Sequence, residues 1–187
     1  MVNLSKSRMM IPMLLLAATY SVAAEPPQSS EVGDYVPSYA STKCGGIDDG
    51  VPAGKTLCYT CRAGEEPIFY IFAKQPSDSV VKLVKQIELI VVARKKEKTA
   101  AVVNFLGDPK NEQARKDVAN FGTKHDLRNV SLTITSDGSK FSLDEGDEVT
   151  VILFENGIIR LRNSAKYGSL DQKAIDSIVR RSKALLE

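Results

Sequence analysis

Three cysteines, Cys44, Cys58 and Cys61, are the residues of this 187-residue sequence whose types and spacing could do redox chemistry. Cys58 and Cys61 form a C-x-x-C segment, a spacing found in disulfides and in reversible dithiol pairs. Because the number of cysteines is odd, at most one internal disulfide forms, and the third thiol stays free, pairs with a second chain or reacts. The haem-binding variant C-x-x-C-H is excluded because Arg62 stands where the histidine would be.

The three thiols allow three kinds of site, and the residues alone leave all three open. The first is a structural disulfide, Cys58–Cys61 or Cys44 joined to either, which would stabilise a glycine-rich segment. Closing the loop from Cys44 to Cys58 would contribute about 3 kcal/mol in the chain-entropy model. The second is a redox pair, in which Arg62 and Lys55 favour the thiolate. The third is a metal held by three thiolates, although a zinc site usually has a fourth protein ligand.

The other residues with chemical potential form weaker candidates. The single histidine, His125, lies beside Lys124 and Asp126 in an expected exposed turn, far along the chain from the cysteines. The acidic stretch at residues 144–148 lacks the ligand spacing of a calcium loop, so we interpret it as a solvated loop. The basic run at residues 94–98 is typical of a helix end, where cations suit the helix dipole. We therefore predict no metal and no cofactor.

The first 24 residues have the composition of a secretory signal peptide. Lys6 and Arg8 form its positive start, residues 9–18 form a short apolar run, and small residues precede the expected cleavage between Ala24 and Glu25. A membrane-spanning helix needs roughly 20 consecutive apolar residues, and this run is shorter. We therefore predict export, to the periplasm or out of the cell, into an environment that allows disulfides.

The charge of the mature chain argues against two classes of partner. Cleavage would remove 2 of the 25 basic residues and no acidic residue, which leaves 23 basic and 23 acidic residues among 163. A chain without net charge has no electrostatic footprint for nucleic acid or for an anionic membrane. We therefore predict no nucleic-acid partner and no membrane association after cleavage. A protein is the partner class that remains, and Cys44 could link two chains.

Two irregular segments precede a regular pattern of strands and helices. Residues 25–43 form a polar leader, and residues 44–66 are rich in glycine, with at most one or two short strands near Leu57. Apolar runs then predict five strands, at residues 68–73, 100–106, 130–135, 149–154 and 158–161. Apolar stripes with a spacing of three and four predict three helices, over residues 80–91, 114–121 and 174–185.

Short polar segments predict how these elements begin and turn. Residues 75–79 contain capping side chains and a helix-compatible proline just before the first helix. Asn156-Gly157, between two apolar strands, predicts a hairpin with a type I′ turn, because both central residues of that turn need a positive φ. Ser169 and Gln172 match the capping box at the start of the last helix.

The predicted order is β-α-β-α-β-β-α, an α/β arrangement with a mixed central sheet. Strands joined through a helix pair in parallel with a right-handed connection, whereas the last two strands form an antiparallel hairpin. Helices on both faces of such a sheet make a three-layer sandwich. The domain would cover residues 44–187.

This order resembles the core of the thioredoxin fold, and three segments strengthen the resemblance. Residues 149–161 look like the terminal hairpin of that fold, and residues 32–37, Val-Gly-Asp-Tyr-Val-Pro, are similar to the opening segment of peroxiredoxins. The C-x-x-C-R segment at residues 58–62 precedes the first core strand, as in a group of exported bacterial thioredoxin-like proteins. The resemblance covers roughly residues 31–187.

The resemblance also implies a site that this sequence does not fill. Thioredoxin chemistry needs a thiolate at the amino end of the helix after the first core strand, and residues 74–79 contain no cysteine. The fold's second signature is a cis-proline before the third strand, yet residues 129–132 contain no proline, so we expect a trans bond there. Cys58 and Cys61 would lie where the first core strand begins, roughly 20 Å from its other end.

We therefore interpret the chain first as an exported thioredoxin-fold protein without the standard thiol site, acting as a binding or structural module. The alternative is a thiol–disulfide oxidoreductase that uses Cys58 and Cys61 from this displaced position. A third reading is a peroxiredoxin-like protein that binds a partner through the vacant groove.

Overall fold

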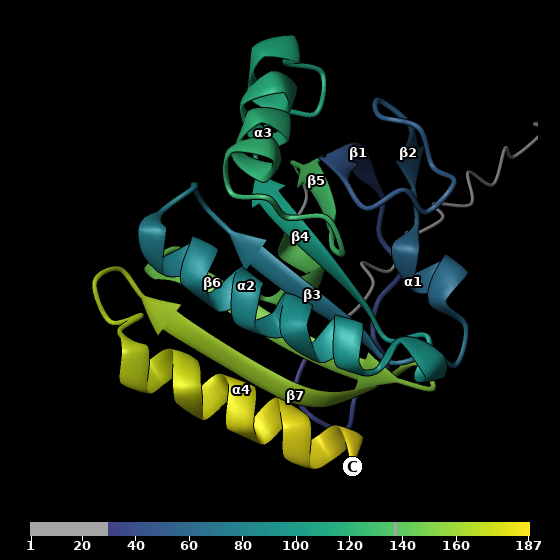
Figure 1. The fold of residues 1–187 in the computed structure, drawn as a ribbon, viewed down its shortest axis with the longest axis vertical. Helices are drawn as coiled ribbons and strands as arrows, with labels where there is room; N and C mark the ends of the chain where they lie inside the picture. Colours follow the sequence, from purple (N-terminus) through teal and green to yellow (C-terminus); the bar gives the residue numbers. More distant parts are fainter. Residues whose placement is uncertain (1–29, 137) are drawn as a thin grey trace, which may run out of the picture.

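A mixed sheet forms the centre of the computed structural model, which describes residues 30–136 and 138–187 (Figure 1). Its strands are β1 (Ser41–Gly46), β2 (Thr56–Leu57), β3 (Ile68–Ala73), β4 (Ala100–Leu106), β5 (Ser131–Thr135), β6 (Asp147–Glu155) and β7 (Ile158–Lys166). Its helices are α1 (Tyr59–Ala63), α2 (Asp78–Ala93), α3 (Glu112–Lys124) and α4 (Gln172–Leu186), with short 3₁₀ turns η1 (Lys95–Glu97) and η2 (Ser139–Phe141). The predicted signal peptide and its cleavage site lie outside the described residues.

The seven strands are arranged in the order β2-β1-β5-β4-β3-β6-β7. β3 is buried along its whole length and pairs in parallel with β4 and antiparallel with β6, as a continuous apolar run predicts. β4 and β5 are also parallel, and β6 and β7 form the predicted hairpin. The α/β class and the core order β-α-β-α-β-β-α are thus confirmed. Among the described helices, none combines the length and apolar character of a membrane span.

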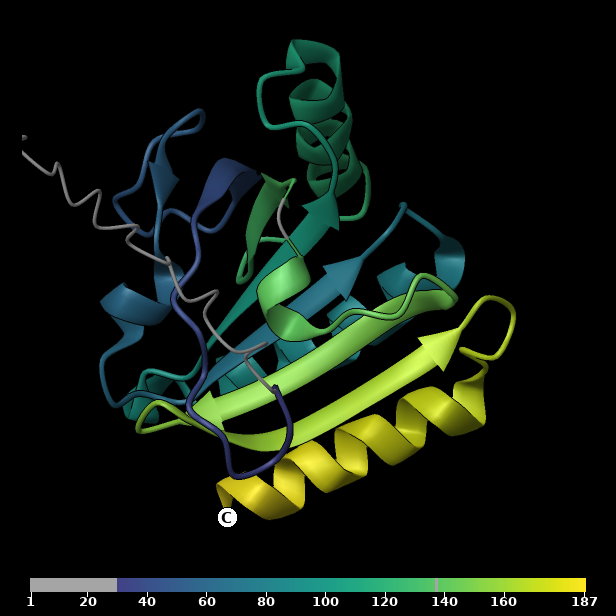
Figure 2. The ribbon, with the colours of Figure 1, turned by 180° about the vertical axis from the view of Figure 1, so that it is seen from behind.

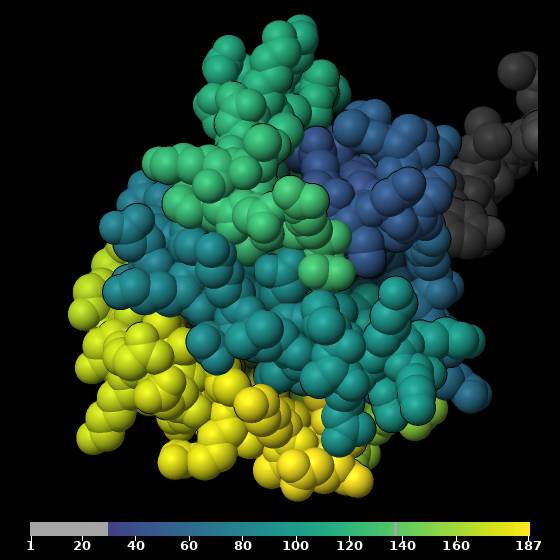
Figure 3. All heavy atoms as spheres, viewed as in Figure 1, coloured from purple at the N-terminus to yellow at the C-terminus, as the bar shows by residue number. Residues whose placement is uncertain are grey.

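The two faces of the sheet are covered in different ways. One face packs against α2, α3 and α4 through a large apolar cluster, and in atomic spheres the side chains of α2 lie between those of α3 and α4 (Figure 3). The other face is covered by the segment before β1, by α1 and by η2, with Tyr39, Tyr59 and Phe141 buried there (Figure 2). α2 connects β3 to β4, and α3 connects β4 to β5, so both connections cross the sheet in the same direction. Connections of this kind have the same handedness, which places α2 and α3 on the same face of the sheet.

Residues 30–43 belong to the folded unit, which differs from the polar leader that composition predicts for residues 25–43. Val36 and Tyr39 are buried, and the Tyr39 ring packs edge-to-face on Tyr70 with ring centroids 5.2 Å apart. β1 itself begins at Ser41. Gly46 ends β1 with a φ of +86°, and a Cβ there would lie 2.0 Å from the Val130 oxygen, so only glycine fits this pairing.

Local signals for turns and caps were right in two cases and wrong in one. Asn156 and Gly157 have φ values of 54° and 73°, which confirms the type I′ hairpin. The Ser77 hydroxyl caps α2 by accepting the Val80 N–H at 3.2 Å. The capping box at Ser169 and Gln172 is wrong: the Asp171 carboxylate is the N-cap of α4 and accepts the Ala174 N–H at 2.8 Å. Ser169 instead donates to the Lys166 carbonyl at 2.7 Å and closes the preceding turn.

Candidate redox site

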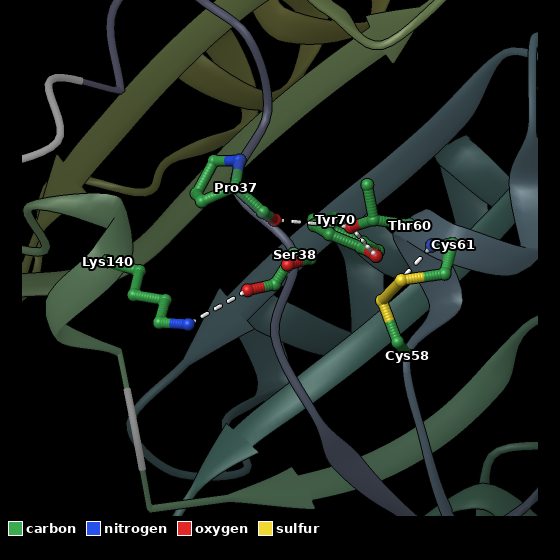
Figure 4. Close-up of a disulfide and its surroundings, with 7 residues drawn as sticks. All are labelled: Pro37, Ser38, Cys58, Thr60, Cys61, Tyr70 and Lys140. Atoms are coloured by element: carbon green, nitrogen blue, oxygen red, sulfur yellow. Dashed lines mark hydrogen bonds between the residues drawn. A yellow bond between two sulfur atoms is a disulfide. The ribbon is translucent and has the colours of Figure 1, made fainter.

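A disulfide joins Cys58 and Cys61, whose Cα atoms lie 5.3 Å apart (Figure 4). Cys58 is the N-cap residue of α1, and its sulfur accepts a hydrogen bond from the Cys61 N–H at 3.1 Å. Cys61 is exposed to solvent and Cys58 is partly buried. The pair therefore lies at the start of a helix with one sulfur-bearing residue open to an approaching thiol.

Long-range contacts position α1 on the sheet. The Thr60 hydroxyl lies 2.7 Å from the Tyr70 hydroxyl on β3 and donates to the Pro37 carbonyl at 3.3 Å (Figure 4). Burial raises the pKa of Tyr70, so its phenol stays protonated in this contact. Tyr59 is buried on the same face of the sheet. α1 is thus fixed by its own side chains as well as by the segment before β1.

The two ends of the parallel strands carry different groups. We call the edge where β3, β4 and β5 begin the entering end, and the edge where they finish the leaving end. α1 lies at the entering end, whereas α2 begins at the leaving end (Figures 1 and 2). A cavity that both α1 and the first residues of β3 and β4 line places α1 in the same way. The cysteine pair and the start of α2 therefore lie near opposite ends of the parallel strands.

Asp49, in the loop between β1 and β2, connects several elements around the pair. Its carboxylate forms an ion pair with Lys43, whose side chain is only 4% exposed, and accepts a hydrogen bond from the Ser131 hydroxyl at 2.9 Å. Its backbone carbonyl accepts a hydrogen bond from the Arg62 guanidinium. Burial alone would raise the pKa of Asp49, but the hydrogen bonds that it accepts, first from Lys43, bring the pKa below its ordinary value.

A cavity of about 420 Å³ lies between α1 and the entering end of the sheet. Tyr59, Arg62 and Ala63 line it from α1. Burial raises the pKa of Tyr59 to about 12, so its phenol is neutral at physiological pH and lies 3.4 Å from the Asp49 carboxylate. The cavity is thus lined by the side of α1 that carries Tyr59, Arg62 and Ala63, and neither disulfide cysteine is among its lining residues.

Cys44 does not join the other two cysteines. It is a free thiol in β1, 7% exposed, within the apolar cluster that contacts α2 and α3. Burial raises its pKa to about 11, although Arg115 lowers it in part, so the thiol stays protonated. Of the pairings that the sequence left open, the structure contains Cys58–Cys61, and the three sulfurs do not form one ligand set. No group of three metal-ligating side chains occurs within residues 30–136 and 138–187.

At the leaving end, the start of α2 is occupied by the protein's own carboxylate. The Ser77 hydroxyl donates to Glu148 Oε1 at 2.6 Å, and the Lys74 N–H donates to the Glu148 carbonyl at 3.3 Å. Asp147 and Glu148 are the first residues of β6 and are 8% and 6% exposed, so the interpretation of the acidic stretch as a solvated loop is wrong for these two residues. It is confirmed for Asp144 and Glu145, which are exposed in the loop before β6. A long-range partner, Ser77, accounts for the burial of Glu148.

Residues 129–132, where the resemblance implies a cis-proline, lie at the entering end of the sheet and not beside the start of α2. β5 is parallel to β3 and β4, so it begins at the entering end, where Ser131 contacts Asp49. The strand antiparallel to β3 is β6, and its first residues face α2. The position of the fold's proline therefore corresponds to residues 146–148, Gly-Asp-Glu, which contain no proline. The described residues contain no cis peptide bond.

His125 lies away from the cysteine pair. It is the C-cap residue of α3 and packs on the Phe121 ring with centroids 5.0 Å apart. It lines a shallow hollow with Ser77 and Asp78 at the start of α2. The structure thus places the histidine beside the start of α2 and not beside α1, which carries the disulfide.

Sequence reasoning missed the residues that connect the site. Asp49 and Ser131 are 82 positions apart, and Ser77 and Glu148 are 71 positions apart. Neither pair has a local pattern, because each depends on which strand ends meet in the sheet. The one local signal is the Asp-Asp-Gly turn at residues 48–50, whose Asp49 carboxylate accepts the Val51 N–H at 3.1 Å.

Comparison with solved structures defines the fold. The sequence matches no protein-family model and no curated protein. The structure is similar to a protein of Chlorobium tepidum assigned as the thiol:disulfide interchange protein DsbE, with a TM-score of 0.61 and 12% identity over 84% of this chain and 99% of the other. It is also similar to the Chromobacterium violaceum thiol peroxidase, with a TM-score of 0.58 and 13% identity over 84% and 88%.

A third similar structure is AhpC of Mycobacterium bovis, with a TM-score of 0.62 and 12% identity over 83% of this chain and 97% of the other. At these identities the likeness concerns the fold. The chain has a thioredoxin fold, and it carries a Cys58–Cys61 disulfide at the entering end of the sheet.

Proposed function

We propose that the protein carries out thiol–disulfide exchange through Cys58 and Cys61. The observation that carries this proposal is an exposed disulfide at a helix start, in which the Cys58 sulfur accepts the Cys61 N–H at 3.1 Å. A hydrogen-bond donor aimed at sulfur favours a negative charge there once the disulfide opens. The thioredoxin fold of the chain, similar to an interchange protein and a thiol peroxidase, supports this class of chemistry.

The exchange begins at Cys61, because it is the more exposed of the two cysteines. A substrate thiolate attacks the Cys61 sulfur and forms a mixed disulfide, while the sulfur–sulfur bond breaks and Cys58 leaves as a thiolate. A second substrate thiolate then attacks the substrate sulfur of the mixed disulfide and releases Cys61. The substrate loses two electrons and two protons and becomes a disulfide, and Cys58 and Cys61 gain them as two thiols.

A purely structural role explains less of this geometry. Closing the four-residue loop from Cys58 to Cys61 contributes about 2 kcal/mol in the chain-entropy model, less than a longer loop would. Thr60 and Tyr59 already anchor α1 to the sheet. The position of α1 is therefore supported by contacts other than the disulfide.

A second candidate function is a binding or structural module without thiol chemistry. The observation that favours it is the filled start of α2, where Ser77 and Glu148 contact each other and no cysteine is present. A fold whose usual site is closed in this way could act through its surface alone. The disulfide would then be a passive crosslink.

The reduction potential of the purified mature protein separates the two functions. An exchange centre has a potential between about −120 and −270 mV; its disulfide form oxidises a dithiol substrate, and its reduced form reduces a disulfide substrate. A potential below about −300 mV without turnover would support the structural module and contradict our proposal. The Cys44→Ala variant is the control, because its thiol lies in the core and takes no part in the exchange.

We also propose that the protein acts outside the cytoplasm. The signal-peptide pattern of residues 1–24 supports this location, and an oxidising compartment keeps the Cys58–Cys61 disulfide formed. Cell fractionation followed by amino-terminal sequencing tests it. A mature chain that begins at Glu25 in the exported fraction is expected, whereas an uncleaved chain in the cytoplasm would contradict it.

A further inference from the structure

Thr60 lies between the two cysteines of the disulfide, directly before Cys61 (Figure 4). The N–H that contacts the Cys58 sulfur at 3.1 Å belongs to the peptide group that joins Thr60 to Cys61. Because a peptide group is planar and rigid, the backbone of Thr60 sets the direction of this N–H. Contacts that fix Thr60 therefore also fix the donor that faces the sulfur.

The Thr60 hydroxyl is held by two groups from other parts of the chain. It donates to the Pro37 carbonyl at 3.3 Å and lies 2.7 Å from the Tyr70 hydroxyl of β3. A hydroxyl has one proton to donate, so with that proton directed at Pro37 the Tyr70 phenol is the donor in the second contact. Burial raises the pKa of Tyr70, which keeps this phenol protonated. Thr60 is thus fixed to the centre of the sheet as well as to the segment before β1.

Both anchors of Thr60 are themselves fixed. Tyr70 belongs to β3 and is completely buried. The carbonyl of Ser38, the residue after Pro37, accepts a hydrogen bond from the Lys140 side chain of η2 at 3.1 Å (Figure 4). None of these contacts involves a sulfur atom, so reduction of the disulfide removes none of them.

The anchoring of Thr60 has its largest effect in the reduced protein. In the oxidised protein the sulfur–sulfur bond itself keeps Cys58 beside Cys61. Once that bond opens, α1 has only five residues, too few to stay helical through its own hydrogen bonds. The contacts of Thr60 then keep the Cys61 N–H directed at Cys58, where it stabilises the thiolate. Stabilising the reduced form of the pair raises its reduction potential.

We propose that Thr60 is a positioning residue that raises the reduction potential of the Cys58–Cys61 pair. Anchored by Tyr70 and Pro37, it holds the Cys61 N–H toward the Cys58 sulfur when the disulfide is open. This inference rests on the proposed thiol–disulfide exchange and adds how the potential of that same site is set. Bond making and bond breaking stay with Cys58 and Cys61.

Redox equilibrium with glutathione tests the inference. Two glutathione thiols reduce the protein disulfide to two thiols and become one glutathione disulfide, so the ratio of the two protein forms gives the equilibrium constant. Thr60→Val keeps the shape of the side chain and removes the hydroxyl, and we expect it to lower this constant about three- to tenfold. A tenfold loss corresponds to about 30 mV. Thr60→Ser keeps the hydroxyl and its hydrogen bonds, so its constant should stay within about twofold of the native one.

The matched control is Thr123→Val, which removes another helical threonine hydroxyl, the donor to the Ala119 carbonyl at 3.2 Å in α3, and should leave the constant unchanged. A loss of stability that is equal in the oxidised and the reduced protein would not change the constant. A native-like constant in Thr60→Val, or the same loss in Thr60→Ser, would therefore overturn the inference and leave the exchange intact. A native disulfide that does not equilibrate with glutathione at all would instead overturn the proposed function.

The pH dependence of alkylation gives a second readout. In the reduced protein, Thr60→Val should raise the pH midpoint of Cys58 alkylation by iodoacetamide, by up to about one pH unit for a tenfold effect, because the thiolate loses its donor. An unchanged midpoint would contradict the role of Thr60.

Tyr70→Phe keeps the test valid if Thr60→Val does not fold, because it removes the phenol donor and leaves the sequence of α1 intact. It should lower the glutathione equilibrium constant in the same direction. An unchanged constant in folded Tyr70→Phe protein would contradict the role of this anchor.

Discussion

The starts of α1 and α2 show the same capping geometry with different chemistry. In α1, the Cys58 sulfur accepts the N–H of the residue three positions on at 3.1 Å, and in α2 the Ser77 hydroxyl does the same at 3.2 Å. α2 is 16 residues long and α1 is only 5. The long helix thus carries an inert cap at the leaving end, whereas the short helix carries the thiols at the entering end.

The surroundings of the two caps differ more than the caps do. At α2, the buried Glu148 carboxylate accepts the Ser77 hydroxyl proton at 2.6 Å, so a negative charge already lies there. At α1, Cys61 is exposed and Arg62 is the adjacent residue. A thiolate is stabilised by nearby donors and cations and destabilised by a carboxylate. The start of α1 therefore favours a thiolate, whereas the start of α2, beside a carboxylate, opposes one.

The largest expected effect is loss of exchange when the α1 pair is broken. Cys58→Ser or Cys61→Ser removes one of the two sulfurs, so the variants should show no measurable turnover of a disulfide substrate. Their free energy of unfolding should fall by about 2 kcal/mol, the value for a short crosslinked loop. Turnover assays and denaturant unfolding measure both. Residual turnover in either variant would show that exchange does not need the pair.

The next effect concerns Asp49, which stabilises the entering end. Asp49→Asn leaves the buried Lys43 without a counter-ion, so we expect a loss of about 3 kcal/mol in the free energy of unfolding. The control Glu112→Gln breaks the exposed pair with Lys116 and should change stability by less than about 0.5 kcal/mol. A loss as small as that of the control would mean that Asp49 does not support this end.

The pH dependence of stability tests the contribution of Asp49 in a second way. The folded pKa of Asp49 is lowered, so its contribution is present above the unfolded value of about 3.9 and is lost as the pH falls through the folded pKa. The stability difference between the native protein and Asp49→Asn should therefore shrink below about pH 4. A difference that grows on acidification would contradict this sign.

The contrast between the two ends also explains what the sequence could predict. Continuous apolar runs identified β3 and β4 with their observed bounds, because a strand buried on both faces is mostly apolar, and Asn104 of β4 is the exception. α1 was missed because five residues are too few to show helical periodicity. It is held by a hydrogen bond between the Thr60 and Tyr70 hydroxyls, whose oxygens lie 2.7 Å apart. This contact between α1 and β3 has no local signal in the sequence.

The buried charges show the same limit. Lys43 and Glu148 read as exposed residues from their type alone, yet they are 3% and 6% exposed. Each is buried because a partner from another element meets it, Asp49 for Lys43 and Ser77 for Glu148. The cysteine pair could be found from its spacing, whereas the groups that surround it depend on the order of strands in the sheet.

A smaller effect is expected when a thiol is moved to the start of α2. Ser77→Cys, in a Cys58→Ser/Cys61→Ser background, should react with iodoacetamide no faster than an ordinary thiol, because the Glu148 carboxylate opposes the thiolate. Adding Glu148→Gln should raise the rate about tenfold, which corresponds to roughly one pKa unit. The matched control is Glu148→Gln with Ser77 intact. A fast reaction of Ser77→Cys alone would show that the carboxylate does not close this site.

The smallest effect concerns Cys44, which tests whether burial alone separates an inert thiol from the reactive pair. Burial raises the pKa of this thiol to about 11, so at pH 8 only about one molecule in a thousand carries the thiolate. After reduction of the disulfide, iodoacetamide should label Cys58 and Cys61 quickly and Cys44 only after unfolding. Mass spectrometry of peptides from native and unfolded samples measures the three sites. Equal labelling of Cys44 in the native protein would show that the core around β1 opens, and the distinction between the buried and the exposed thiols would then rest on sequence position alone.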